Sequence, residues 1–239
     1  MADLVVIVPT RGRPNAAAEV AATFAATCTA DTRVSFAIDA DDPNRHAYLK
    51  LAGAEQVHSI IEQPPGGTMV SALNMAAETL LSPDPQFGRT APYALGFMGD
   101  DHRPRTKGWD TAYLEALRDL GTGMVFGDDQ IQRERLPTQI AMTADIVRAV
   151  GSMAPASLVH LCVDNWWLEL GRAAGCIRYL PGVTVEHMHP VAGKAEWDEG
   201  HRRVNAPVMY HHDQSTMARL RVTDLPAAVA KVKALRGVQ

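Results

Sequence analysis

The sequence predicts an α/β fold in which a mostly parallel, doubly wound central sheet is flanked by helices. Short apolar runs alternate with helix-like segments through the first half of the chain, which is the pattern of such a sheet. With 46% hydrophobic and 21% charged residues, the 239-residue chain can bury a substantial core. A polar loop follows each apolar run, and ligands bind beyond the carboxyl ends of parallel strands. The sequence therefore predicts a ligand site at one edge of the sheet.

The first elements are a strand, a helix and a second strand. Residues 4–8 form an apolar run ended by a proline, as expected of a buried strand. A proline and an asparagine open an alanine-rich helix that is predicted over residues 14–27. The apolar run 34–38 predicts the second strand, and it leads into an acidic loop at 39–43.

The alternation continues to the middle of the chain. Further strands are expected at 57–61 and 93–98, and further helices at 46–54 and 68–81. Prolines punctuate residues 82–92, which predicts a loop there.

The second half is less regular, so its elements are predicted from local patterns. These are helices at 108–120, 144–150, 163–174 and 225–235, and strands at 124–126 and 178–185. The histidine-rich segment 190–213 lacks an apolar period, which predicts a loop or lid.

Charge and cysteine content narrow the class of protein. A net charge of −4 argues against a protein whose main function is to bind the backbone of a nucleic acid. Three cysteines without a Cys-x-x-Cys spacing predict neither a disulfide framework nor a zinc knuckle, and they favour a cytoplasmic location. No apolar run reaches the roughly 18 residues of a spanning helix. We therefore expect a soluble protein.

Paired carboxylates follow the strand expected at 93–98. Asp100 and Asp101 offer hard oxygen ligands, which suit Mg²⁺ or Mn²⁺ beside a diphosphate. An Asp-Asp pair also caps turns and helices. From the residues alone, a metal site and a simple turn are both open.

Six segments, taken in order, resemble family 2-like glycosyltransferases of the GT-A fold. They are VVIVPTRGRP, FAIDADDP, PPGGTMVSALNMAAE, LGFMGDDHRPRTKGWD, VDNWWLELGRAAG and LPGVTVEH, and they span roughly residues 4–189. The resemblance implies a GT-A domain over 1–189, with a nucleotide-binding half at 1–103 and an acceptor half at 104–189. A C-terminal lid and closing helix of the same domain would occupy 190–239.

The resemblance implies that strand-end residues bind a nucleotide-diphosphate sugar, linked to UDP or GDP. Thr10 and Arg11 would cradle the nucleotide, and Asp39, or its neighbour Asp41, would bond the base or ribose. The further residues implied in binding are Gly67, Asn74 and Asp100.

The resemblance also implies a metal site for Mn²⁺ or Mg²⁺. Asp101, at the last position of the acidic motif, and His187, after a late strand, would hold the ion. His189 is the alternative histidine. Gly99 stands where the first aspartate of an Asp-x-Asp motif usually falls, so one ligand is either missing or supplied by Asp100.

Asp164 matches the aspartate of the Glu-Asp pair that acts as general base in inverting members of the family, with Val163 in the glutamate position. A base here would remove the proton of the acceptor hydroxyl. The structural alternative for Asp164 is an N-cap of the helix at 163–174.

Two polar segments keep open alternatives. The lid candidates are Lys194, His201, Arg202 and Arg203. They would close over the diphosphate as cations, or belong to a solvated loop. A second Gly-Asp-Asp, at 127–129, would line the acceptor side or form a turn.

Together these features predict a metal-dependent glycosyltransferase, inverting with Asp164 as base. The alternatives are a retaining transferase on the same fold and a catalytically silent nucleotide- or sugar-binding module. A nucleotidyltransferase is disfavoured, because no Gly-rich, Lys-bearing loop follows the first strand. The acceptor is left open, nucleic acid included.

Overall fold

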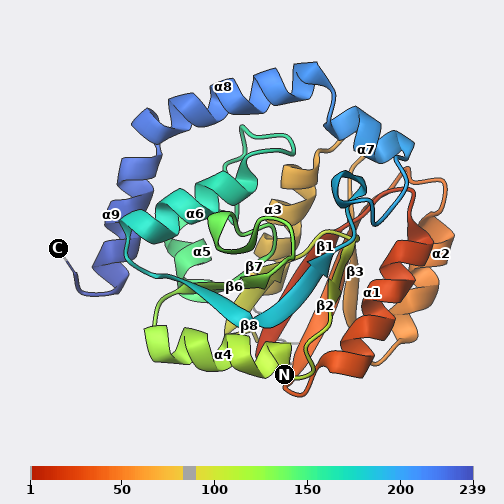
Figure 1. Cartoon of the computed structure of the whole chain (residues 1–239), viewed down its shortest axis with the longest axis horizontal. Coiled ribbons are helices and arrows are strands. Elements are labelled where there is room, and N and C mark those ends of the chain that lie inside the picture. Colours follow the sequence, from red (N-terminus) through yellow and green to blue (C-terminus); the bar gives the residue numbers. More distant parts are fainter. Residues whose placement is uncertain (1, 83–89, 239) are drawn as a thin grey trace.

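One eight-stranded sheet forms the centre of the computed structural model, which describes residues 2–82 and 90–238. The strand order is β3-β2-β1-β4-β7-β6-β8-β5 (Figure 1). The strands are β1 (Leu4–Pro9), β2 (Thr32–Asp39), β3 (Val57–Gln63), β4 (Ala94–Phe97), β5 (His102–Pro104), β6 (Met124–Asp128), β7 (Ile140–Thr143) and β8 (Ile177–His187). Most of the loop predicted at 82–92 lies outside the described residues.

The predicted parallel sheet is confirmed for its first half. β1 pairs in parallel with β2 and β4, and β2 pairs in parallel with β3. The short strands β5 and β7 were missed by the sequence analysis, and both are antiparallel to their neighbours. With three and four residues they are too short to show a strand period, and long-range pairing with β8 and β4 stabilises them.

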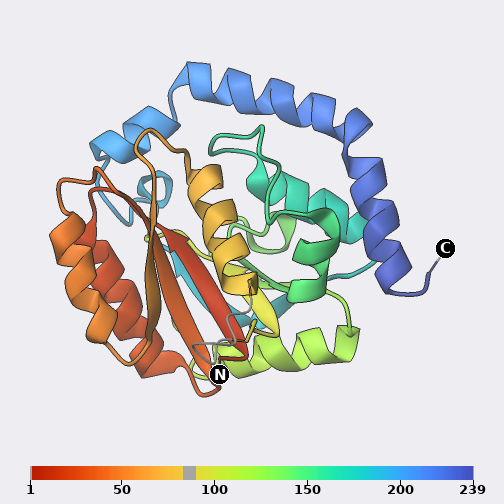
Figure 2. The same ribbon diagram turned by 180° about the vertical axis from the view of Figure 1, so that it is seen from behind.

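Helices cover both faces of the sheet (Figures 1 and 2). They are α1 (Pro14–Thr27), α2 (Arg45–Leu49), α3 (Met69–Leu81), α4 (Trp109–Leu120), α5 (Ala144–Val150), α6 (Val163–Ala173), α7 (Glu199–Val204), α8 (Pro207–Thr223) and α9 (Leu225–Leu235). The helix predicted at 46–54 is shorter, because a 3₁₀ turn at Lys50–Gly53 replaces its second half. The bounds of α1, α5 and α9 agree with the prediction.

Side-chain alternation on β1 explains why its sequence is a continuous apolar run. Val5 and Ile7 pack into the core shared with α3, α5, α6 and α9. Leu4, Val6 and Val8 pack on the opposite face, with α1 and α4. Because both faces of the strand are buried, neither set of positions is polar.

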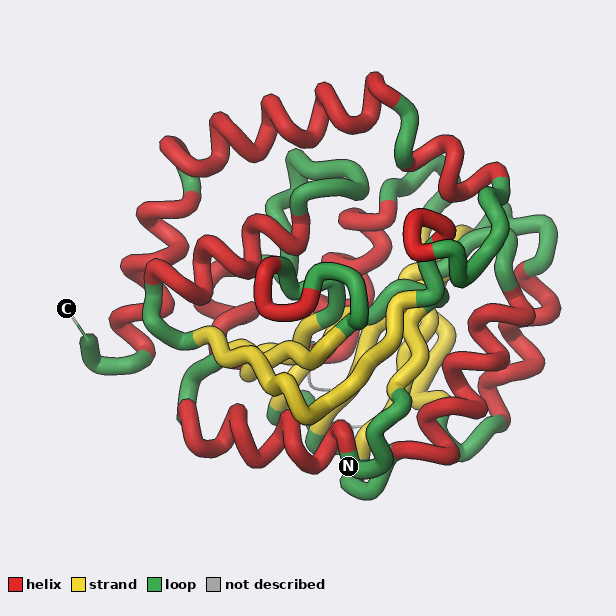
Figure 3. Tube along the Cα trace, in the orientation of Figure 1, coloured by secondary structure: helices red, strands yellow, loops and turns green. Residues whose placement is uncertain are grey.

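The prediction of a loop or lid for 190–213 is wrong for residues 199–204, which form α7, and from Pro207 onward, where α8 begins. Figure 3 shows α8 and α9 as continuous helices along the outer rim of the molecule. The buried positions of α8 are Asp213, Met217 and Leu220, which follow helical spacing. The helical pattern of apolar residues is not visible in the sequence, because a charged residue, Asp213, occupies one of the buried positions. It accepts hydrogen bonds from the backbone of residues 159–161 at 2.7–3.0 Å.

None of the helices in the described ranges has the length and apolar character needed to cross a membrane.

Candidate active site

A cavity of about 890 Å³ lies at the carboxyl ends of β1, β2, β3 and β4. Segments from the second half of the chain, including residues 159–165 and the region around α7, form its other walls. Nine of the predicted nucleotide-binding, metal and catalytic residues line it: Thr10, Arg11, Asp39, Asp41, Gly67, Asp100, Asp101, Asp164 and His187. The alternative histidine His189 and the lid candidates His201 and Arg203 also line it. Residues that are far apart in the chain therefore share one cavity.

An acid–base cluster occupies the cavity end at β2. The Arg11 guanidinium donates to Asp39 and, at 2.7 Å, to Asp41. Its hydrogen bond lowers the pKa of Asp41. Asp39 is 7% exposed and also accepts a hydrogen bond from Gln63. The side-chain oxygens of Asp39 and Asp41 are thus fixed where a nucleoside could present hydroxyl or ring N–H donors.

Gln63, at the end of β3, is a site residue that the sequence analysis missed. Its Oε1 accepts from the Ser71 hydroxyl at 2.7 Å, which fixes the amide that faces Asp39. A Cβ at Gly67 would lie 2.2 Å from Gln63 Oε1, so a larger residue there would push the Gln63 amide out of this position. The sequence could have predicted Gln63, because it is a polar residue at the end of its strand, as Asp39 is at the end of β2.

Asp100 faces the β1 loop rather than the histidines. Its Oδ2 accepts from the Thr10 hydroxyl at 2.7 Å, and its Oδ1 lies 3.1 Å from Arg13 Nη1. Burial, followed by the charge of Asp101, raises the pKa of Asp100. Asp100 therefore organises the loop after β1, and its two oxygens are already engaged.

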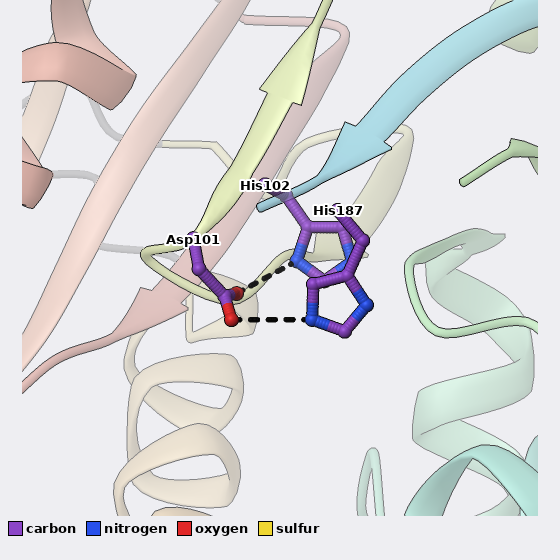
Figure 4. Close-up of side chains that lie close together, drawn as sticks. All are labelled: Asp101, His102 and His187. Carbon is purple, nitrogen blue, oxygen red and sulfur yellow. Dashed lines mark hydrogen bonds and ion pairs between the residues drawn. The ribbon is translucent and has the colours of Figure 1, made fainter. Parts of the chain in front are cut away.

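Asp101, His102 and His187 form a cluster at the junction of β4, β5 and β8 (Figure 4). Asp101 Oδ2 lies 3.1 Å from His187 Nε2, and Asp101 Oδ1 lies 3.3 Å from His102 Nδ1. His102 pairs with His187 across the β5–β8 ladder, and their rings are stacked with centroids 4.2 Å apart. The predicted pair is thus brought together, and His102 is an addition.

Gly99 fits this cluster for a steric reason. A Cβ at position 99 would lie 2.5 Å from Asp101 Oδ1 and 3.0 Å from His102 Nδ1. An aspartate in the usual first position of the motif would therefore displace both side chains. The backbone N–H of Gly99 donates to His102 Nδ1 at 3.0 Å.

The residues present fit a divalent metal ion. One carboxylate and two imidazoles place their ligand atoms within 4.8 Å of one another, a mixed donor set that suits Mn²⁺. Burial opposes ionisation of Asp101, but its contacts with His102, His187 and His201 outweigh this effect and hold its pKa well below the usual range. The Nε2 atom of His201 is buried without a hydrogen-bond partner in the described structure, and it lies 3.9 Å from Asp101 Oδ2.

Asp164 lies in the first turn of α6 and lines the cavity. The N-cap position belongs to Cys162, in a left-handed conformation with φ 63°, so the N-cap alternative for Asp164 is wrong. Its Oδ1 accepts from the N–H of Asn165 at 2.9 Å, and no side chain of the described residues hydrogen-bonds it. Burial raises the pKa of Asp164 to about 6.

Replacing Asp164 with asparagine is expected to stabilise the fold. The raised pKa means that the folded state binds more protons than the unfolded state between pH 4 and 6. The wild-type protein therefore loses stability as pH rises through this window, and the uncharged variant does not. We expect the variant to gain about 1–3 kcal/mol in free energy of unfolding at pH 7 and nothing at pH 3.5. Urea unfolding at both pH values measures this, and an equal gain at both would contradict it.

Asn74 lies apart from the cavity-lining residues. Its amide donates to the carbonyl of Ala154 at 2.8 Å and accepts from the N–H groups of Met153 and Ala154 at 3.1 and 3.0 Å. The amide thus holds the start of the segment that leads to the cavity wall. A positioning role fits these contacts better than contact with a nucleotide.

The second Gly-Asp-Asp ends β6, and its last residue, Asp129, organises the loop that follows. Asp129 Oδ1 accepts from three successive backbone N–H groups, at residues 131, 132 and 133, and its Oδ2 accepts from the Thr138 hydroxyl. The loop that it organises contributes Ile131, Gln132 and Thr138 to the cavity wall.

Comparison with known proteins shows the fold. No protein-family model and no curated protein sequence matches the chain. Among solved structures, it is similar to the mannosyltransferase PcManGT from Pyrobaculum calidifontis, in complex with GDP-Man and Mn²⁺. The TM-score is 0.64 at 15% identity, over 99% of this chain and 76% of that one.

It is also similar to TarS from S. aureus, with a TM-score of 0.60 at 12% identity over 94% of this chain. The chain spans only 44% of that TarS chain. TarS 1–349 in complex with UDP-GlcNAc gives a TM-score of 0.59 at 13% identity, over 94% of this chain and 74% of that one. The chain therefore has the GT-A fold that the sequence motifs predicted.

Proposed function

We propose that the protein is a metal-dependent glycosyltransferase that moves a sugar from a nucleotide-diphosphate sugar to an acceptor with inversion at the anomeric carbon. One observation carries the proposal: Asp39, Asp101, Asp164 and His187 line the same cavity. The structural neighbours in complex with GDP-Man and UDP-GlcNAc support this class of donor.

In this proposal the nucleoside occupies the end of the cavity at β2. The carboxylates of Asp39 and Asp41 accept hydrogen bonds from the base or the ribose, and Arg11 holds them in place. The Thr10 hydroxyl donates a hydrogen bond to Asp100 and holds it beside the loop that follows β1. Arg13, which pairs with Asp100 and Asp198, lines the same part of the cavity.

Asp101 and His187 would hold the divalent ion. When bound, the ion supplies a positive charge that stabilises the departing diphosphate. The residues fit this task because Asp101 is ionised and His187 lies in contact with it. The sugar then lies between this cluster and α6.

Asp164 is the proposed general base. An acceptor hydroxyl attacks the anomeric carbon, the bond from that carbon to the diphosphate oxygen breaks, and Asp164 takes the hydroxyl proton. A pKa of about 6 suits the role, because the carboxylate is ionised at neutral pH and still basic enough to accept a proton.

The three free cysteines support the cytoplasmic setting proposed for the enzyme.

A panel of UDP- and GDP-sugars, incubated with the protein and Mn²⁺, tests the proposed function. We expect slow hydrolysis of at least one donor, detected by NMR as free sugar, and loss of this activity with EDTA. The configuration of the first product formed tells inversion from retention. Absence of both binding and hydrolysis across the panel would contradict the proposal.

A further inference from the structure

Part of the cavity wall comes from the start of α8, where one aromatic side chain is exposed. Tyr210 lines the cavity and is 41% exposed. The phenylalanine and tryptophan rings that line the cavity in the described ranges, Phe97 and Trp167, pack against each other and against the core. Tyr210 is therefore the aromatic residue of the cavity whose ring a ligand can contact.

The ring of Tyr210 is held in place through its own hydroxyl. That hydroxyl donates to Asn205 Oδ1 at 2.9 Å, and Asn205 Nδ2 donates to the carbonyl of His201 at 2.8 Å. Tyr210 is thereby tied to the end of α7. Because its polar end is bonded to the protein, the apolar faces of the ring are what it offers to a ligand.

Three further residues of the cavity lining are His160, Asn165 and Gln214, and their side chains have no hydrogen-bond partner among the described residues. Burial lowers the pKa of His160 to about 4, so its ring is neutral at pH 7. A neutral imidazole and an amide each donate and accept hydrogen bonds, as a hydroxyl group does. These side chains therefore match a ligand that is rich in hydroxyl groups.

Asp213 brings these groups together. Its buried carboxylate accepts hydrogen bonds from the backbone of residues 159–161 at 2.7–3.0 Å. Gln214 is the next residue of α8, and Tyr210 lies about one helical turn before Asp213. The exposed ring and the partner-free side chains thus lie where α8 meets the segment 159–161.

The same segment leads to the proposed base. Asp164 follows residues 159–161 after one short stretch of chain, and Asn165 is its neighbour at the start of α6. Both line the cavity. The α8 wall and the carboxylate that would take the acceptor proton are therefore connected through a few residues.

We propose that the start of α8 forms the acceptor subsite and that the acceptor is a carbohydrate, with a sugar ring stacked on Tyr210. The side chains of His160, Asn165 and Gln214 then bind hydroxyl groups of that sugar. A sugar ring combines apolar C–H faces with hydroxyl groups at its edge, which matches an aromatic face beside amides. The inference rests on the proposed function, whose acceptor it names by chemical class.

Transfer to simple glycosides tests the acceptor class. The methyl glycosides of glucose, galactose, mannose and N-acetylglucosamine are incubated with Mn²⁺ and the donor found in the panel, and mass spectrometry detects the disaccharide. We expect transfer to at least one of them. Hydrolysis of the donor without transfer to any glycoside would overturn the carbohydrate acceptor and leave the proposed function standing. A donor that is neither bound nor hydrolysed would overturn both.

Two substitutions of Tyr210 test the stacking. Tyr210→Ala is expected to raise the KM for the glycoside by about tenfold, because the ring face is lost. Tyr210→Phe keeps the ring and should stay within about threefold of wild type. The matched control is His211→Ala, which removes an exposed ring on α8 outside the cavity lining and should leave the KM unchanged. An unchanged KM in Tyr210→Ala would overturn the stacking role.

Gln214→Ala gives a second test that does not depend on the aromatic ring. Gln214 is exposed and its amide has no partner in the described structure, so its removal should leave the melting temperature unchanged. We expect the KM for the glycoside to rise by about threefold to tenfold, the usual effect of one lost hydrogen bond. A KM equal to that of wild type would contradict the assignment of Gln214 to the acceptor subsite.

Discussion

Asp164→Asn is expected to lower kcat for sugar transfer by about 10²–10⁴-fold, the usual contribution of a positioned general base. The asparagine keeps the shape of the side chain but cannot take the acceptor proton. Binding of the nucleotide should stay within about threefold of wild type, because Asp164 lies at α6, away from the Asp39 end of the cavity. Steady-state kinetics with the donor found in the panel, together with calorimetry of nucleotide binding, separates these effects.

The pH profile gives an independent test of the same role. Because the base acts in its ionised form, wild-type kcat should fall as pH drops through about 6, the raised pKa of Asp164. The residual activity of Asp164→Asn should not show this fall in kcat at low pH. Asp119→Asn, an exposed surface acid on α4, is the matched control and should behave as wild type. Turnover by Asp164→Asn at the wild-type rate would rule out the base.

Asp101→Asn is expected to weaken Mn²⁺ binding by more than about 100-fold, since loss of a mere supporting residue around a metal costs 10–100-fold. The substitution removes the negative charge of the carboxylate, whose Oδ2 lies beside His187 and whose Oδ1 lies beside His102. Nucleotide affinity should then become independent of Mn²⁺. Calorimetry of UDP and GDP with and without the ion measures both effects.

A comparison of two histidines refines this prediction. His187→Ala should match Asp101→Asn, because His187 contacts Asp101 directly. His189→Ala should retain most of the Mn²⁺ affinity, because that side chain instead accepts the N–H of Val191 beyond the end of β8. If His189→Ala loses the ion and His187→Ala keeps it, the ligand assignment is wrong.

Local signals predicted the fold well where they were strong. Pro14 at the first turn set the start of α1, and the apolar run of β1 marked a strand buried on both faces. The missed elements depend on distant partners. β7 needs β4 beside it, and α8 carries a buried Asp213 that binds the backbone of another segment.

The candidate site divides in the same way. The resemblance to GT-A enzymes predicted Asp39, Asp101, Asp164 and His187, and the cavity brings them together. His102 was not predicted, because it reaches the cluster through strand pairing with β8. His201 was named only as a lid candidate, and it lines the cavity from α7.

A crystal structure grown with Mn²⁺ and the preferred nucleotide tests the central claim most directly, with the ion located by its anomalous scattering. We predict an anomalous peak in contact with Asp101 and His187, and a diphosphate that links it to a nucleoside beside Asp39. A nucleotide bound outside this cavity, or an ion in contact with neither Asp101 nor His187, would contradict the account.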